Sequence, residues 1–95
     1  MSAACFYGND VANFTRSEVV QILRAAQGRA CSICQKHLTR FDATIDHVVP
    51  RSLGGSHSFR NWLLAHKVCN EAKGSEPPQQ HEIDLLSKVI ARLSL

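Results

Sequence analysis

The chain has 95 residues, of which 44% are hydrophobic and 20% are charged. These values allow one small domain and exclude a disordered or fibrous protein. No apolar run approaches the ~20 residues of a transmembrane helix, so no membrane partner is expected. The first residues lack the basic and apolar regions of a signal peptide. We therefore expect a cytoplasmic protein that is not secreted.

The formal net charge of +3 is concentrated in the middle of the chain. Between residues 29 and 73 there are seven Lys or Arg residues and three Asp or Glu residues. An excess of positive charge in one segment suits an anionic partner such as nucleic acid. A solvated basic face explains the charge alone equally well.

The first predicted element is an amphipathic helix over residues 15–28. Thr15 and Glu18 have the spacing of a capping box, and Gly28 is a suitable left-handed stop. Apolar residues recur between them at helical spacing. They are Val19, Val20, Ile22, Leu23 and Ala26.

Two short elements are predicted in the middle of the chain. Residues 44–49 indicate a strand that ends before Pro50, because proline cannot donate a ladder hydrogen bond. Residues 67–73 indicate a two-turn helix closed by Gly74. After the break at Pro77 and Pro78, residues 80–94 predict a second amphipathic helix. Its apolar stripe comprises Ile83, Leu86, Val89, Ile90 and Leu93.

Three of the four cysteines form a pattern typical of metal ligands. Two residues separate Cys31 from Cys34, and two separate His66 from Cys69. Such pairs direct four donors at one tetrahedral zinc ion and leave no position open for substrate, so the predicted zinc is structural. Disulfides are less expected in a chain without secretion signals. The fourth cysteine, Cys5, is predicted to be an ordinary thiol.

The segment between and around these pairs is too short to be stabilised by apolar burial alone. We expect the zinc ion and the two flanking helices to supply the rest.

Further polar residues occur in a fixed order that zinc does not explain. The order is Cys-x-x-Cys, Asp46-His47-x-x-Pro, Gly-Gly, Asn61, His-x-x-Cys-Asn70, Lys73-Gly. Over residues 31–74 it closely resembles the HNH endonucleases. The resemblance implies an α+β fold with a ββα-metal (His-Me finger) core over 31–74, stapled by a structural zinc and flanked by the two helices. One HNH nuclease domain would then span residues 1–95, encoded by a bacterium or a phage.

The resemblance also implies roles for single residues. His47 corresponds to the general base that deprotonates the attacking water, and Asn61 to the residue that steadies the loop and orients His47. Asp46 and Asn70 correspond to ligands of a catalytic divalent cation. In this sequence the second ligand pair begins with His66 instead of the usual cysteine, a change that zinc accepts.

The chemistry of these residue types supports the same roles. A neutral imidazole has a pKa near the operating pH and accepts a proton from water. A carboxylate and an amide oxygen suit Mg²⁺ or Mn²⁺ and leave room for a phosphate. One rule opposes the assignment, because Asp46 and His47 would face opposite sides of a regular strand. The strand must therefore end or bulge there, or one assignment is wrong.

Basic residues near this site are candidates for DNA backbone contacts. Arg51 and Arg60 bracket the Gly-Gly loop, and Lys73 shares a helix face with Asn70. A solvated surface charge is the alternative for each. The remaining histidines, His37, His57 and His81, are expected at the surface, although His57 lies in the loop near Asn61.

The sequence thus predicts a metal-dependent DNA endonuclease that hydrolyses phosphodiester bonds by a one-metal mechanism. It would nick or cut with little sequence preference, since no long recognition element is present. The alternative is a zinc-stapled nucleic-acid-binding module that does not cleave. The two amphipathic helices leave room for a homodimer.

Overall fold

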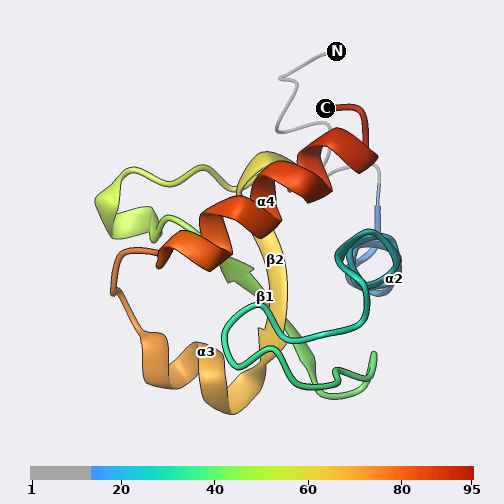
Figure 1. Ribbon diagram of the computed structural model, residues 1–95, viewed down its shortest axis with the longest axis horizontal. Helices are drawn as coiled ribbons and strands as arrows, with labels where there is room; N and C mark the ends of the chain where they lie inside the picture. The colour runs from blue at the N-terminus through green and yellow to red at the C-terminus, as the bar shows by residue number, and fades with distance from the viewer. Residues whose placement is uncertain (1–13) are drawn as a thin grey trace.

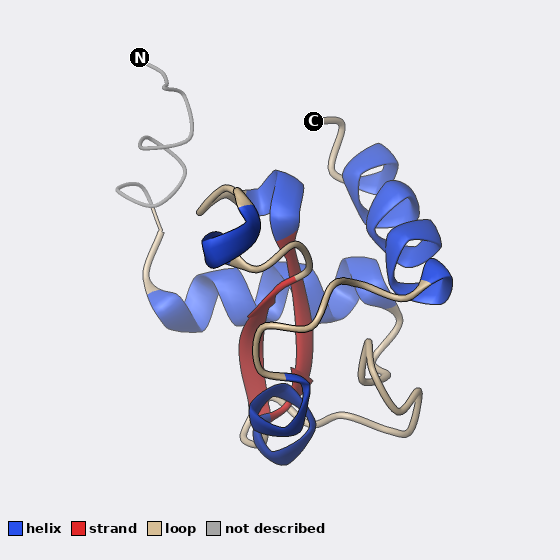
Figure 2. Cartoon of the chain, turned by 90° about the vertical axis from the view of Figure 1, so that its left-hand side faces the viewer, coloured by secondary structure: helices blue, strands red, loops and turns tan. Residues whose placement is uncertain are grey.

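The computed structural model describes residues 14–95, and Cys5 therefore lies outside the described residues. At the centre is an antiparallel hairpin of β1 (Ala43–His47) and β2 (Trp62–His66). In its register Ala43 pairs with His66 and His47 pairs with Trp62. Helices precede and follow the hairpin (Figures 1 and 2). The predicted α+β class and the ββα core with helices at both ends are confirmed.

Helix α2 (Arg16–Gln27) precedes the hairpin. Its capping box forms as expected, because Thr15 Oγ1 accepts from the Glu18 amide and the Glu18 carboxylate accepts from the Thr15 amide. Gly28 ends the helix with a φ of 90°, in the left-handed region that glycine tolerates. The predicted stripe faces the core, where Val19, Val20 and Leu23 are buried.

The β1 strand is shorter than the sequence suggested. It ends at His47 and not at Val49, and a long loop with two short 3₁₀ turns, η1 (Arg51–Leu53) and η2 (Phe59–Asn61), leads to β2. Asp46 and His47 are therefore the last two residues of β1. The β2 strand was not located by sequence periodicity, because Trp62 to Ala65 are all buried and show no alternation.

Helix α3 (Lys67–Lys73) follows β2 without a linker and is closed by Gly74 as predicted. Helix α4 (Gln80–Arg92) then packs on α2 and contacts η2 (Figure 1). The predicted stripe of α4 is wrong at one position, because Ile83 is 41% exposed while Glu82 is buried. The helix is turned so that the Glu82 carboxylate meets the Lys73 amine inside the fold.

One buried polar side chain joins α2 to the hairpin. The Gln27 amide accepts from the Leu64 backbone N–H at 2.7 Å and donates to the Leu64 carbonyl at 2.7 Å. This pair of bonds imitates a neighbouring strand and satisfies backbone groups at the free edge of β2. The hairpin is thereby fixed against α2 by directional bonds as well as by apolar packing.

Within residues 14–95, every helix is too short or too polar to cross a bilayer.

Candidate metal centre and active site

Four side chains converge at the end of the hairpin where α3 begins. Cys31 and Cys34 come from the segment after α2, His66 ends β2, and Cys69 lies in α3. Their ligand atoms all lie within 4.8 Å of one another, and His66 Nδ1 is 3.4 Å from Cys34 Sγ and 3.8 Å from Cys69 Sγ. Donors about 3.8 Å apart are the edges of a tetrahedron around zinc with bonds of about 2.3 Å. The four predicted ligands thus form one Cys₃His metal site.

Neighbouring backbone groups orient these ligands. His66 Nε2 is 2.9 Å from the His37 carbonyl, which leaves Nδ1 directed at the sulfurs. Backbone amides of Ile33 and His66 lie 3.4 Å from Cys31 Sγ and stabilise negative charge there. Three thiols and an imidazole without an open position are the donor set of structural zinc.

The crowding of thiols is itself unfavourable without a cation. Desolvation and the adjacent Cys34 and Cys31 raise the pKa of Cys69 to about 11. Thiolates this close repel one another, and a divalent cation offsets that repulsion and displaces the protons. The donor chemistry therefore fits zinc.

A second site lies further along β1, in an open hollow of about 300 Å³. Asp46 and His47 line it from the end of β1, Asn70 from α3, and Arg51 from the loop. Asp46 and His47 still belong to the paired part of β1, and the Asp46 side chain is 3% exposed because it turns to Lys73. The structure therefore places the candidate base His47 and the candidate cation ligands Asp46 and Asn70 around one hollow. Of the three basic candidates, Arg51 lines the same hollow.

The His47 ring is partly buried and contacts a second histidine. Its Nε2 lies 2.9 Å from His57 Nδ1, and His57 in turn lies edge-on to Trp62 at 5.0 Å between ring centroids. Desolvation lowers the pKa of His47, and the charges of His57, Arg51 and Lys73 lower it further. The lowered pKa favours the neutral imidazole, the form that accepts a proton.

Asp46 is buried and belongs to an ion-pair network centred on Lys73. Lys73 Nζ lies 3.1 Å from Asp46 Oδ2, 2.9 Å from Glu82 Oε1 and 3.1 Å from the Val48 carbonyl. Burial raises the pKa of Asp46, Lys73 opposes that shift, and Glu82 adds to it. Two carboxylates thus share one amine in the interior next to the hollow.

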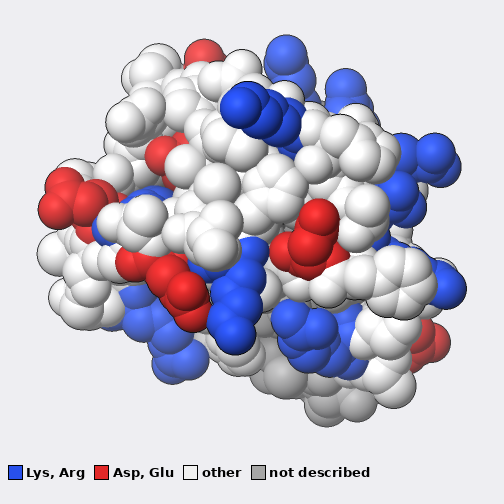
Figure 3. Space-filling view, turned by 90° about the horizontal axis from the view of Figure 1, so that it is seen from below, with Lys and Arg blue, Asp and Glu red and all other residues white. Residues whose placement is uncertain are grey.

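The structure differs from the expectation for Lys73. Its side chain is 6% exposed and its amine is engaged by two carboxylates, whereas a phosphate contact requires an accessible amine. Arg51 and Arg60 are exposed, as a backbone contact requires, but Arg60 does not line the hollow. Figure 3 shows Lys and Arg side chains interleaved with smaller acidic groups on the face seen from below.

The Asn70 side chain has a fixed orientation. Its Nδ2 donates to Thr44 Oγ1 at 3.2 Å and to the Ile45 carbonyl at 3.1 Å. Both amide hydrogens are therefore used within the hairpin. The oxygen Oδ1 is the side-chain atom left to act as a ligand.

Asn61 lies outside the hollow and binds the loop that frames it. Its Oδ1 accepts from the Val49 amide, and its Nδ2 donates to the Val49 and Ser56 carbonyls, each at 2.9 Å. Gly55 packs so closely here that a Cβ would clash with the Val49 carbonyl and lie 2.7 Å from Asn61 Nδ2. The hydrogen bonds of Asn61 thus fix the loop at Val49, two residues after His47.

Together these features define a zinc-stapled ββα fold that carries a histidine beside a carboxylate and an amide. Residues 31–76 match the model of the HNH endonuclease family. This part of the chain is therefore an HNH endonuclease domain, and the family consists of phosphodiester hydrolases that act on nucleic acid. A search of the curated proteins gives no match.

Sequence reasoning did not assign three residues that shape the site. Glu82 belongs to a helix whose periodicity placed its neighbour Ile83 inward. Gln27 follows the apolar stripe of α2 and had no local signal. His57 was expected at the surface, in the loop near Asn61. Its position ten residues after His47 was the one sequence signal for the contact between the two rings.

Proposed function

We propose that this chain is a metal-dependent DNA endonuclease that hydrolyses phosphodiester bonds with one catalytic cation and His47 as general base. The observation that carries the proposal is the shared hollow, which is lined by His47, Asp46 and Asn70. Such an arrangement serves hydrolysis and is not needed for binding alone.

Asp46 and Asn70 are the residues that would hold the catalytic cation. Both offer hard oxygen donors, which suit Mg²⁺ or Mn²⁺. Lys73 Nζ contacts both Asp46 oxygens, at 3.3 and 3.1 Å, but an ionised carboxylate has about four acceptor positions and keeps capacity for a cation. When bound, the cation neutralises charge on the phosphate oxygens and on the departing oxygen.

The reaction requires a water molecule to attack phosphorus while one P–O bond breaks. His47 accepts a proton from that water through Nδ1, since Nε2 is 2.9 Å from His57. The departing alkoxide then takes up a proton from solvent. His57 acts as a positioning residue, because its contact fixes the tautomer and the ring orientation of His47.

Two further residues hold the reacting groups in place. Asn61 keeps the loop after His47 closed through its three hydrogen bonds. Lys73 holds Asp46 at the edge of the hollow and compensates its buried charge. We therefore assign both to positioning and not to contact with the reacting atoms.

Arg51 and Arg60 are proposed to contact the DNA backbone. Such contacts orient a duplex without reading its sequence, which supports cleavage with little sequence preference. One hollow of this kind acts on one strand, so a monomer would nick. A homodimer would make paired nicks and so linearise the plasmid. The ratio of nicked to linear plasmid, together with the molar mass from light scattering, distinguishes the monomer from the homodimer.

The alternative is a nucleic-acid-binding module that keeps the fold without cleaving. A plasmid relaxation assay with zinc-loaded protein and added Mg²⁺ or Mn²⁺ distinguishes them. We expect supercoiled DNA to be relaxed or linearised when either cation is present. Supercoiled DNA left intact with every divalent cation tested would establish the binding module.

A further inference from the structure

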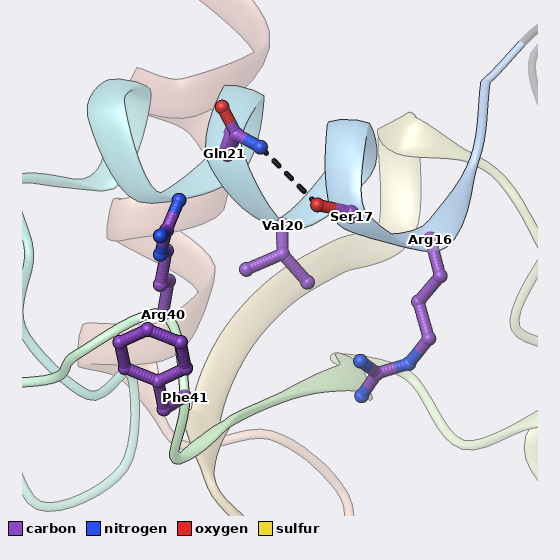
Figure 4. Close-up of a pocket in the computed structure, with 6 residues that line it drawn as sticks. All are labelled: Arg16, Ser17, Val20, Gln21, Arg40 and Phe41. Carbon is purple, nitrogen blue, oxygen red and sulfur yellow. Dashed lines mark hydrogen bonds between the residues drawn. The ribbon is translucent and has the colours of Figure 1, made fainter.

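A second surface lies beside the candidate active site, at the start of β1. We call it the Phe41 surface and define it by Arg16, Arg40, Phe41 and Lys67. Two adjoining hollows of about 340 and 610 Å³ meet there, and both are lined by Arg16 and Phe41. Figure 4 shows the smaller hollow between α2 and the turn that carries Arg40 and Phe41.

Phe41 is unusual for a large apolar side chain in this fold. It is 85% exposed, more than Val68 (71%), Leu53 or any other exposed large apolar side chain in residues 14–95. The Arg40 guanidinium lies 4.9 Å from the ring centroid and covers one ring face. Because the side chain remains so exposed, the opposite face is open to a planar partner.

The surroundings of the ring are positively charged. Arg16 comes from α2, Arg40 from the turn before β1, and Lys67 from the first residue of α3. Within residues 14–95, both ion pairs involve Lys73, so these three cations are not neutralised by carboxylates. Asp42 is the acidic residue in the hollows, and its carboxylate accepts from the Thr39 amide at 2.9 Å.

This surface adjoins the proposed cation site through one residue. Thr44 lines the larger hollow, and its hydroxyl accepts from Asn70, which lines the candidate active site. The chain from Phe41 to His47 spans no more than about 20 Å at ~3.3 Å per residue. That length corresponds to about six base steps of a DNA strand at ~3.4 Å each.

We propose that the Phe41 surface binds the DNA strand that flanks the scissile phosphate, with an unpaired base stacked on Phe41. An exposed aromatic ring beside cations is how proteins bind single strands, because every base has a face to stack. Bases inside a duplex already cover one another, so the ring favours a substrate with an unpaired flank. This inference rests on the proposed function and specifies its substrate.

The test measures binding without cleavage. The zinc-loaded 95-residue chain with His47→Ala serves as the parent. Fluorescence anisotropy measures its binding to two labelled DNAs. One is a blunt duplex, and the other is the same duplex with six unpaired nucleotides at one end. We expect the parent to bind the flanked DNA more tightly. Phe41→Ala should weaken binding to the flanked DNA by about tenfold and leave the blunt duplex within twofold.

Control variants distinguish the loss of stacking on Phe41 from the loss of any exposed apolar side chain. Phe41→Trp should retain the preference for the flanked DNA, because indole stacks at least as well as phenyl. Ile83→Ala removes an exposed apolar side chain from α4 and should change neither affinity. The double variant Arg16→Gln, Arg40→Gln should lower the salt dependence for the flanked DNA by about 1.4 in logarithmic slope.

Equal affinity of Phe41→Ala and its parent for the flanked DNA would overturn the inference. So would a parent that binds both DNAs alike, or neither. Because binding is read separately from plasmid relaxation, these outcomes are distinct from a failure of the wild type to cleave.

Discussion

His57 Nδ1 lies 2.9 Å from His47 Nε2, and the two imidazole rings are nearly parallel, with centroids 5.2 Å apart. Two nitrogens at this distance share one hydrogen, because two N–H groups facing each other would repel. The contact therefore opposes a second proton on His47. It also directs the other nitrogen of His47 away from His57, which leaves Nδ1 for the proposed proton transfer.

Removing His57 is expected to slow cleavage without unfolding the protein. In His57→Ala the His47 ring loses the contact that fixes its orientation, and a misplaced base costs about 10-fold to 100-fold in rate. Single-turnover cleavage measures the rate, and thermal unfolding should be unchanged. His37→Ala, which removes an exposed histidine outside the hollow, should cleave like the wild type. A fully active His57→Ala would contradict the positioning role.

The lowered pKa of His47 predicts the acid limb of the pH–rate profile. The base acts when neutral, so activity is present above this pKa and is lost as the pH falls through it. Because desolvation, His57, Arg51 and Lys73 all lower the pKa, we expect the limb below the usual value of about 6.5.

Arg51→Gln removes one of those charges and should move the limb to higher pH. Arg60→Gln also removes an exposed arginine but should leave the limb in place, even if both variants bind DNA more weakly. A limb that stays fixed in Arg51→Gln, or one that moves equally in both variants, would contradict this assignment of charges.

The metal site should determine whether the core folds. Structural zinc contributes about 10–16 kcal/mol at pH 7, which matches or exceeds the whole stability of a typical domain. We therefore expect Cys34→Ala to lose bound zinc and most of its folded circular dichroism signal. Cys5→Ala is the matched control and should keep one zinc per chain. A folded, active Cys34→Ala would show that the staple is dispensable.

The loop after His47 should depend on Asn61 and on the space at Gly55. Asn61→Asp keeps the shape but replaces the donor of two hydrogen bonds with an acceptor. We expect it to cost about 2–3 kcal/mol in urea unfolding and to reduce cleavage.

Alanine substitutions at Gly54 and Gly55 compare the stability cost at two neighbouring glycines of the same loop. Gly55→Ala should cost more than Gly54→Ala, because a Cβ at Gly55 meets the Val49 carbonyl whereas one at Gly54 meets open space. Gly54 has a φ of 94°, so its replacement still costs about 1 kcal/mol. Equal losses at the two glycines would contradict the packing described here.

Lys73 is expected to matter for stability more than for DNA affinity. Lys73→Met leaves Asp46 and Glu82 buried without a cation, and such a loss typically costs about 3–5 kcal/mol. Urea unfolding measures this cost. Lys88→Met, on the exposed side of α4, should change stability by less than about 0.5 kcal/mol. Unchanged stability in Lys73→Met with weakened DNA binding would instead support the surface contact expected from the sequence.

The features that the sequence predicted are those encoded by local spacing. The Cys-x-x-Cys pair, the His-x-x-Cys pair and the Thr15–Glu18 box each join residues three positions apart, so local backbone geometry brings the two members of each together. The Lys73–Glu82 ion pair depends on which face of α4 is buried. Apolar periodicity predicted that face incorrectly at Ile83, which is exposed. The β2 strand lacked alternation because both of its faces are buried.

The most direct test compares cleavage by zinc-loaded wild type and His47→Ala at saturating DNA with Mg²⁺ or Mn²⁺. We expect the wild type to cleave and His47→Ala to be inactive while its zinc content, folded signal and DNA affinity remain unchanged. A His47→Ala protein that retains those three properties and still cleaves at the wild-type rate would show that this imidazole is not the base.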